Sequence, residues 1–535
     1  MYKYSGIIRD LESGLPLAGV TVKLQNNLID LAKDVSGANG VWEIEGIDAG
    51  SQLSFFLKGY TPIHVASSEG QDIRLIPSKI FAYSDKDTYS PNENVRLFVH
   101  SKEKFYFKLV RYGMSIDTLL KSDEINPIIQ EHRGPFSIDK GLSWKSHIDI
   151  LLPVELVSGL YGIQLIDKQN SETVVPIVIR IRSSSNQNKI MIVANTLTWH
   201  ANNTFGGKSR YHDLEKIRTS SQGILIQFKK RINTLLYLLG LKKKKVSEES
   251  NETFYISRNR PLRGIGLENV KSVYDGYQSH LAGGEWRLLA WMEEMGYTYD
   301  YYSDTSIAEA PDLIGKYDTV ILNTHSKYWG VEAFKKLFFL HNHKGLNVVN
   351  WGGNAIFSFV HSISNMGFVI EESNEKRDSS GEDIFGVSFN QNSYSSCAPY
   401  IKEKRNHELF DGINDESFGE QSQLMNELWI DSGPQPGRID LGNIAHKYKL
   451  NGIGASGWEV DQIVSHRNKE IELVAVGKNK KGGAHMTFRK KSEVSGFMFS
   501  ASSVAFTASL LVDSNISKLA KNVIIQCHKF GSVKN

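Results

Sequence analysis

The first 80 residues show the alternation of apolar and polar positions that is typical of β-strands facing a core on one side. Val20-Thr21-Val22-Lys23-Leu24 is one such run, and glycine and proline recur between the runs. Because turn residues at this spacing separate short strands, the pattern predicts a small β-sandwich over residues 1–80.

The next hundred residues keep the strand-like pattern. Alternating or apolar runs occur at 94–99, 105–110 and 163–166, the last after the turn Ser158-Gly159. These runs predict a second, immunoglobulin-like sandwich over 81–182. The polar stretch 183–188 has little to bury and is predicted to be a linker.

From residue 189 the pattern changes to strands separated by helices. Short apolar runs at 189–195, 317–323 and 346–351 predict strands, and the stretches 286–295 and 331–341 predict helices. Buried strands separated by helices predict an α/β domain over 189–535 with a mainly parallel sheet. Functional groups are then expected just after Asn195, Asn323 and Trp351, where the strands end.

An insertion at about 212–256 interrupts the α/β pattern. Within residues 223–245, apolar side chains from Leu225 to Leu239 fall on one helical face. Lysines and arginines occur in the middle and at the end of the segment. The charges argue against a membrane span. Two interpretations stay open: the apolar face covers the chain's own core, or the helix binds an anionic membrane or a protein partner.

Composition narrows the classes of function. Among 535 residues, 62 Lys and Arg stand against 59 Asp and Glu, so the nearly balanced charge predicts no binding of nucleic acid. The chain has two cysteines and no apolar segment at its N-terminus, which predicts a cytoplasmic protein without a disulfide framework. The sequence also lacks the GxSxG elbow, the Walker loop and the dinucleotide fingerprint.

The N-terminal turns follow an order seen in a known family. Gly14-Leu15-Pro16-Leu17-Ala18-Gly19-Val20 is followed by Gly40-Val41-Trp42 and then by Gly59-Tyr60. This order resembles the carboxypeptidase regulatory-like, transthyretin-like domain. The resemblance implies that the first 80 residues support or present a neighbouring domain.

A second series of motifs runs through residues 189–520. It comprises Asn195 with the later Gly206-Gly207 and Tyr211, Arg260-Pro261, the helix around Trp291, His325-Ser326-Lys327-Tyr328-Trp329, Gly352-Gly353-Asn354 and Gly457-Trp458-Glu459. The series resembles the family of the large subunit of N,N-dimethylformamidase, whose corresponding motifs include "YGG", "RP", "H.EYW" and "GGN". The resemblance implies a fold like that of class-I glutamine amidotransferases without their cysteine, and hydrolysis of a small amide.

The resemblance also implies roles for individual residues. The family enzyme uses iron held by two tyrosines and a glutamate, which suits a hard ferric ion. Tyr328 is the corresponding ligand tyrosine, with aromatic packing as its alternative role, and Glu382 is favoured over Glu427 as the carboxylate ligand. Glu459 is implied as general base and His325 as the residue that orients substrate or moves a proton. The residues expected to bind substrate are Asn195, Gly206, Gly207 and Asn354.

One departure separates the chain from the family. The second ligand tyrosine falls where this chain has Glu285-Trp286-Arg287, and Tyr299, Tyr301 or Tyr302 are the nearby replacements. Two hypotheses follow. The chain is a C–N hydrolase with a small-molecule substrate, or it is a non-catalytic binding or assembly protein with a degenerate amidase-like domain. Whether it forms a homo-oligomer stays open.

Overall fold

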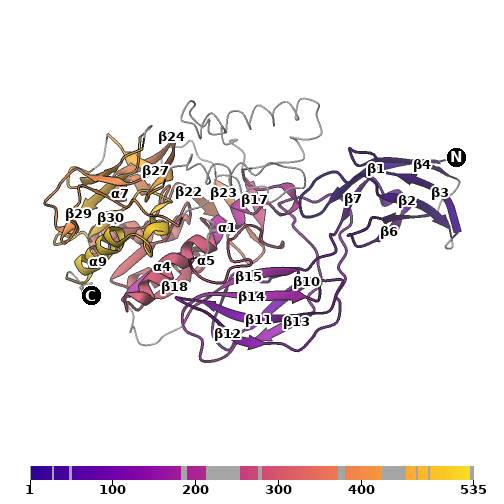
Figure 1. Cartoon of the computed structure of the whole chain (residues 1–535), viewed down its shortest axis with the longest axis horizontal. Helices are drawn as coiled ribbons and strands as arrows, with labels where there is room; N and C mark the ends of the chain where they lie inside the picture. Colours follow the sequence, from indigo (N-terminus) through magenta and orange to yellow (C-terminus); the bar gives the residue numbers. More distant parts are fainter. Residues whose placement is uncertain are drawn as a thin grey trace.

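The computed structural model describes residues 2–26, 29–46, 51–181, 189–211, 254–274, 280–371, 380–423, 453–465, 468–479 and 482–529. It is rich in β-structure and extends from an N-terminal sandwich at one end to an α/β region at the other (Figure 1). The predicted linker and the predicted helix at 223–245 lie outside the described residues.

The N-terminal region consists of two facing sheets, with strand orders β4-β1-β7 and β3-β2-β5-β6. Residues from Ile8 to Leu75 on these sheets form one buried apolar cluster, as the alternating pattern predicted. The elements are β1 (Tyr2–Asp10), β2 (Thr21–Asn26), β3 (Ile29–Val35), β4 (Val41–Gly46), β5 (Gln52–Phe56), β6 (Ile63–Ala66), η1 (Ser67–Glu69) and β7 (Asp72–Leu75).

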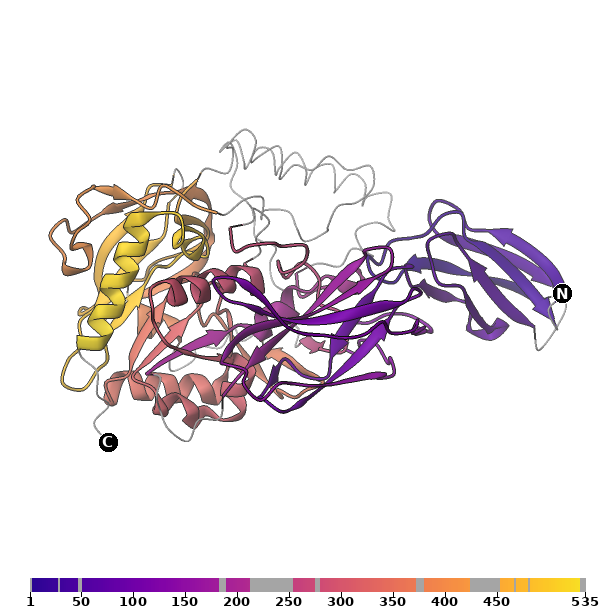
Figure 2. The same ribbon diagram turned by 60° about the horizontal axis from the view of Figure 1, so that its bottom comes forward.

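The second region again pairs two sheets, β13-β10-β8 and β12-β11-β14-β15-β9, around a separate apolar cluster. It lies alongside the α/β region, whereas the first sandwich projects away from it (Figure 2). Its strands are β8 (Phe81–Ser84), β9 (Thr88–Tyr89), β10 (Asn94–His100), β11 (Phe105–Tyr112), β12 (Ile116–Lys121), β13 (Ile148–Leu151), β14 (Gly159–Asp167) and β15 (Glu172–Ile179). The predicted runs at 94–99, 105–110 and 163–166 therefore lie in strands.

The C-terminal region is built on a nine-stranded sheet of order β18-β16-β19-β21-β30-β29-β28-β25-β26. The first five strands are parallel and the last four are antiparallel, so the predicted parallel sheet forms one half of a mixed sheet. Its strands are β16 (Ile190–Ala194), β18 (Asp300–Ser303), β19 (Thr319–Leu322), β21 (Asn347–Asn350), β25 (Tyr400–Lys402), β26 (Ser417–Phe418), β28 (Glu472–Gly477), β29 (His485–Arg489) and β30 (Met498–Ser500).

Helices cover both faces of the parallel half, which explains why its strands are apolar throughout. Ile192 and Ile321 pack with α4 and α9 on one face, and Val193 and Leu322 pack with α5 and α6 on the other. The helices are α1 (Thr196–Asn202), α4 (Ala282–Glu294), α5 (Asp304–Glu309), α6 (Val331–His343), α7 (Gly381–Phe385) and α9 (Ser514–Lys529), with 3₁₀ turns η2 (Phe205–Gly207), η3 (Pro311–Lys316), η4 (Glu408–Phe410) and η6 (Phe506–Ser509). The predicted helices 286–295 and 331–341 correspond to α4 and α6.

Two smaller sheets accompany the nine-stranded one. One has the order β17-β23-β22-β20, and the other is the antiparallel pair β24-β27. These strands are β17 (Phe254–Ser257), β20 (Tyr328–Gly330), β22 (Ser358–His361), β23 (Gly367–Glu371), β24 (Val387–Ala398) and β27 (Ser456–Ile463). Tyr328 and Trp329 lie on β20, and Glu459 lies on β27.

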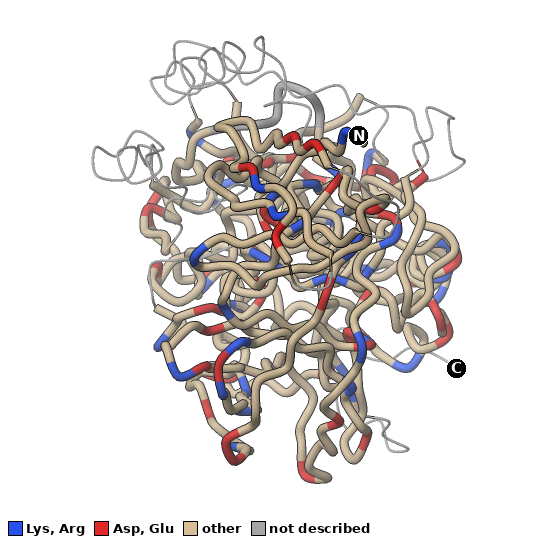
Figure 3. The backbone as a smooth tube through the Cα atoms, turned by 90° about the vertical axis from the view of Figure 1, so that its right-hand side faces the viewer, with Lys and Arg blue, Asp and Glu red and all other residues tan. Residues whose placement is uncertain are grey.

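Basic and acidic residues are interspersed along the described chain when it is viewed end-on (Figure 3). None of the helices formed by the described residues is long and apolar enough to cross a membrane.

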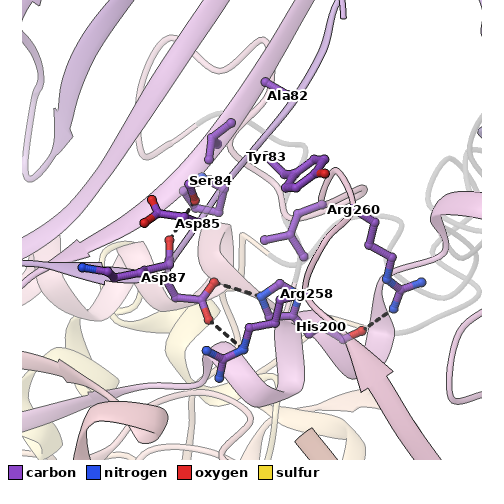
Figure 4. A pocket seen from close by; sticks show the side chains of 12 residues that line it. Ala82, Tyr83, Ser84, Asp85, Asp87, His200, Arg258 and Arg260 are labelled. Carbon is purple, nitrogen blue, oxygen red and sulfur yellow. Dashed lines mark hydrogen bonds and ion pairs between the residues drawn. The ribbon is translucent and has the colours of Figure 1, made fainter. Parts of the chain in front are cut away.

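A polar cluster joins the second sandwich to the α/β region (Figure 4). His200 on α1 contacts Asp87 through Nε2 at 2.9 Å, and Arg258 Nε lies 3.5 Å from the other carboxylate oxygen. Although burial favours the neutral acid, the His200 ring and the Arg258 guanidinium lower the pKa of Asp87. Arg260, from the "RP" motif, donates to the carbonyl of His200 at 2.9 Å. This buried cluster fixes α1 against the sandwich.

Candidate active site

Three predicted site residues come together at the carboxyl end of the parallel strands. His325 follows β19, Asn354 follows β21, and Glu459 lies on β27. His325 Nε2 is 3.2 Å from Glu459 Oε2, and Asn354 Nδ2 donates to the same oxygen at 2.6 Å. The cluster therefore unites three segments that are far apart in the sequence.

The Gly352-Gly353 turn makes this convergence possible. A Cβ at Gly352 would lie 1.9 Å from the carbonyl oxygen of Thr324, and one at Gly353 would lie 2.4 Å from that of Glu459. Only glycine permits such close approach of backbones. The glycines of the "GGN" motif thus allow the loop of His325 and the strand of Glu459 to approach from either side.

The backbone around the cluster is unusual. Thr324, Asn354, Ile356, Trp458 and Ser502 all have positive φ, between 40° and 66°. For β-branched and bulky residues this conformation is a genuine outlier, and such residues gather at functional sites. The strain points to a site whose geometry is held by the surrounding fold.

Buried polar atoms at the cluster have unused hydrogen-bonding capacity among the described residues. His325 Nδ1 and Asn354 Oδ1 make no hydrogen bond there, and His325 Nε2 has its 3.2 Å contact with Glu459 but no hydrogen bond, although the two residues are only 3% and 1% exposed. Buried polar groups are normally hydrogen-bonded, so these atoms indicate a place for a ligand or a bound water. The ring centre of His280 lies 5.0 Å from the ring centres of both His325 and Trp458.

Asp461 supplies a second carboxyl group close to that of Glu459. Asp461, two residues along β27, accepts a hydrogen bond from the backbone N–H of Asn354 at 2.8 Å. Burial, with a contribution from the negative charges of Glu459 and Glu382, raises the pKa of Asp461 to about 7. Asp461 therefore holds the Asn354 turn in place, and Glu382 is an electrostatic neighbour of this carboxyl group.

Asn195 has a different environment from the one predicted. Its Nδ2 donates to the carbonyl of Asn323 at 2.7 Å and to Glu285 Oε1 at 3.0 Å, while its Oδ1 is buried without a partner among the described residues. Asn195 thus joins the ends of β16 and β19. Its predicted contact with substrate stays a prediction.

Gly206 and Gly207 pack against the rest of the protein. A Cβ at Gly206 would lie 2.0 Å from the ring of Phe136, and one at Gly207 would lie 2.6 Å from the carbonyl oxygen of Ser13. The N–H of Gly206 donates to the carbonyl of Glu12 at 2.7 Å. The close approach predicted for a ligand is made by the two sandwiches, so the structure gives these glycines a packing role at a junction.

Glu285 is a buried residue whose importance the sequence did not reveal. Its carboxylate accepts hydrogen bonds from Tyr301 OH at 2.5 Å, from Trp199 Nε1 at 2.8 Å and from Asn195. Burial raises the pKa of Glu285 to about 7. Tyr301, one of the tyrosines considered as a replacement ligand, is thus engaged with Glu285. The available signal was a glutamate directly before the apolar start of the predicted helix 286–295.

Tyr328 is buried in an apolar cluster with Leu197, Ile256 and Phe368, and its hydroxyl is hydrogen-bonded to that of Tyr211. Lys327 separates it in sequence from the His325 loop. The Lys327 ammonium lies 4.9 Å from the ring centre of Tyr211 and 5.7 Å from that of Tyr328. Lys327 occupies the position of the glutamate in the family's "H.EYW" motif.

These residues do not fit an iron ion. A ferric site needs anionic oxygen ligands, whereas here a buried ammonium lies beside both phenols. Glu382, the predicted carboxylate ligand, is an electrostatic neighbour of Asp461.

Comparison with known proteins assigns the chain to a family. Residues 118–518, more than half of the chain, match the family described as N,N-dimethylformamidase beta subunit-like, C-terminal. The chain belongs to this family. The match includes all the motif residues of the α/β region, from Asn195 to Glu459, and it confirms the resemblance inferred from them.

Other comparisons add little to the family match. No curated protein matches the chain. Solved structures that align include native Escherichia coli alpha-2-macroglobulin and a Salmonella alpha-2-macroglobulin mutant, each 12% identical in sequence. These alignments cover 33% and 34% of this chain but only 12% of the other chains, with TM-scores of 0.13 and 0.14.

Proposed function

We propose that the chain hydrolyses the C–N bond of a small amide, or of a metabolite that bears an amide, at the cluster of His325, Asn354 and Glu459. The observation that supports this most strongly is the contact of His325 with Glu459 at 3.2 Å, with Asn354 donating to the same carboxylate. Membership of the dimethylformamidase-like family favours amide hydrolysis as the reaction.

The arrangement is suited to acid–base chemistry. In the proposed reaction, the Glu459 carboxylate takes a proton from water, and the water oxygen adds to the carbonyl carbon. The carbonyl π electrons move to its oxygen. When the tetrahedral intermediate collapses, the C–N bond breaks with its electron pair on nitrogen, which takes the transferred proton through His325. The products are a carboxylic acid and an amine.

Asn354 has a positioning role in this proposal. Its side-chain N–H holds Glu459, and its Oδ1 is available to accept from the water or from the amide N–H of the substrate. Holding a base and a reactant in a fixed geometry contributes much of the rate enhancement in enzymes.

The proposal extends to the finer class of fold. Five parallel strands with helices on both faces, and a site at their carboxyl ends, support descent from a class-I glutamine amidotransferase-like fold. The cysteine of that class is replaced here by the His325–Glu459 pair in our scheme. Cys397 lies on β24, away from any turn between a parallel strand and a helix.

One observation favours the second function, binding without turnover. Lys327 replaces the glutamate of the family motif, so part of the family's machinery has changed. A binding protein would retain small amides in equilibrium dialysis and release no amine. Residues 223–245 stay a proposed contact with an anionic membrane or a protein partner, which flotation of the full chain with phosphatidylserine vesicles tests.

The function is tested by incubating the full chain with a panel of small amides, including formamides, and measuring the amine released. We expect release with at least one amide, and loss of release in Glu459→Gln, which keeps the size of the side chain. Glu371→Gln, a change at a partly exposed residue of β23, is the matched control. Amide turnover by Glu459→Gln at the wild-type rate would refute the proposed role.

A further inference from the structure

Lys327 is a buried residue in the loop that carries His325 of the candidate catalytic pair. The residue is only 4% exposed, and it follows His325 by two positions. Three aromatic rings surround its Nζ: Tyr211 at 4.9 Å, Phe357 at 5.2 Å and Tyr328 at 5.7 Å. Burying a charge is costly unless the surroundings compensate, and aromatic faces attract cations. The three rings thus favour a positive charge at Nζ of Lys327.

The backbone keeps Lys327 and His325 in a fixed relation. The N–H of Lys327 donates to the carbonyl of His325 at 3.0 Å, and the N–H groups of Phe357 and Ser358 both donate to the carbonyl of Lys327. The N–H of Ile356 likewise binds the carbonyl of Ser326 at 2.8 Å. The segment after Asn354 therefore clamps the loop that carries both side chains.

A metal ion among the same phenols would meet this charge. The hydroxyls of Tyr211 and Tyr328 are hydrogen-bonded to each other, so at least one of them carries its proton. A ferric ion bound by both phenolates would displace that proton and would bind between two rings whose centres lie 4.9 and 5.7 Å from the Lys327 ammonium. Like charges in a poorly solvated site repel strongly, so Lys327 and the ion are alternatives.

From these contacts we infer that the site is metal-independent and that Lys327 supplies its positive charge, facing the carbonyl oxygen of a bound amide. This inference rests on the proposed function for the identity of the ligand. In it, the ammonium stabilises the negative charge that develops on the carbonyl oxygen, a task that fixed charges perform well in buried sites. The tyrosines and Phe357 hold the ammonium in position.

Metal binding is the first test, because it does not depend on activity. The wild-type chain, Lys327→Glu and Lys327→Met are each loaded with ferric citrate, desalted, and analysed for iron per chain and for a visible phenolate-to-iron band. We expect no stoichiometric iron in the wild type or in Lys327→Met. Lys327→Glu, which restores the glutamate of the family motif and removes the cation, is expected to gain iron.

Two results would overturn the inference. One is a wild-type chain that retains about one iron per chain with a visible band that Tyr328→Phe abolishes. The other is a folded Lys327→Glu variant that binds no more iron than the wild type, because the ammonium would then not be what excludes the metal. Both results stand even if no amide is hydrolysed, so they separate this inference from the proposed function.

Activity gives the second test. For an amide that the wild type hydrolyses, Lys327→Met should lower kcat/KM by about 100-fold, as removal of an oxyanion donor does in other enzymes. The wild-type rate should be unaffected by a strong iron chelator. Loss of wild-type activity on chelation, with recovery on adding iron, would contradict the inference.

Discussion

The buried carboxyl group of Glu285 predicts an unusual dependence of stability on pH. Its hydrogen bonds come from four donor groups: the backbone and side-chain N–H groups of Asn195, the indole of Trp199 and the hydroxyl of Tyr301. Burial nevertheless outweighs these donors and raises its pKa from 4.5 to about 7. The folded chain therefore holds a proton that the unfolded chain releases.

The sign and the size of the change in unfolding free energy with pH follow from this shift in the pKa of Glu285. Below pH 4.5 both states hold the proton, and the stabilising effect of the protonated form is complete. As the pH rises towards 7, the unfolded state loses the proton first, so the free energy of unfolding falls. A shift of this size corresponds to a loss of about 3 kcal/mol across the window, with little further change above it.

Glu285→Gln removes the titration but keeps the shape of the side chain. At pH 4.5 the variant should be less stable by about 1–3 kcal/mol, because the new amide N–H faces groups that are themselves donors. The difference should shrink or reverse by pH 8, because only the wild type then carries the buried charge. Urea unfolding followed by tryptophan fluorescence, at intervals from pH 4.5 to 8, measures the difference.

A matched control lies on the same helix. Glu294 is exposed near the end of α4, so Glu294→Gln should leave the curve of stability against pH unchanged. Parallel curves for the wild type and Glu285→Gln would refute the account of Glu285. They would show that its carboxyl group does not titrate in this range when the chain is folded.

Further predictions concern the junctions and the site. Gly206→Ala should lower stability by about 1–3 kcal/mol more than Gly19→Ala, since both have positive φ but only Gly206 abuts Phe136; equal losses would contradict the packing role. Asp87→Asn should cost about 3–5 kcal/mol, because it leaves the buried Arg258 guanidinium without its carboxylate and weakens the contact with His200, whereas Asp149→Asn, at an exposed surface pair, should be nearly neutral in the same unfolding assay. Asn354→Gly keeps the positive φ and removes the side chain, so kcat/KM for the amide should fall by about 100-fold with little change in Tm; unchanged turnover would exclude its positioning role.

Local patterns were sufficient to predict much of the fold. The apolar runs that became β16, β19 and β21 are buried on both faces, and that is why they lack alternation. The family motifs pointed to His325, Asn354 and Glu459 as candidate site residues. The structure brings them together, since His325 follows β19, Asn354 follows β21 and Glu459 lies on β27. The antiparallel half of the sheet was not predicted, since its strands carry no signal that distinguishes their direction.

Other features depend on contacts that sequence patterns do not encode. Tyr211 and Tyr328 are 117 positions apart, and Asn195 and Glu285 are 90 apart. The Gly206-Gly207 pair was predicted to approach a ligand, whereas in the structure it packs against Phe136 and Ser13, contacts that depend on how the sandwiches pack. The sequence shows Lys327 within the motif from His325 to Trp329, but the role inferred for it depends on the three aromatic rings that surround its ammonium in the structure.

The central claim is that His325 and Glu459 act as one unit in amide hydrolysis, and a double-mutant cycle tests it most directly. kcat/KM for the amide is measured from the rate of amine release for the wild type, His325→Ala, Glu459→Gln and the double variant. Residues that act together are strongly non-additive, so the double variant should be about as slow as the slower single variant. Losses that multiply would contradict the account, and so would single variants that hydrolyse the amide at the wild-type rate.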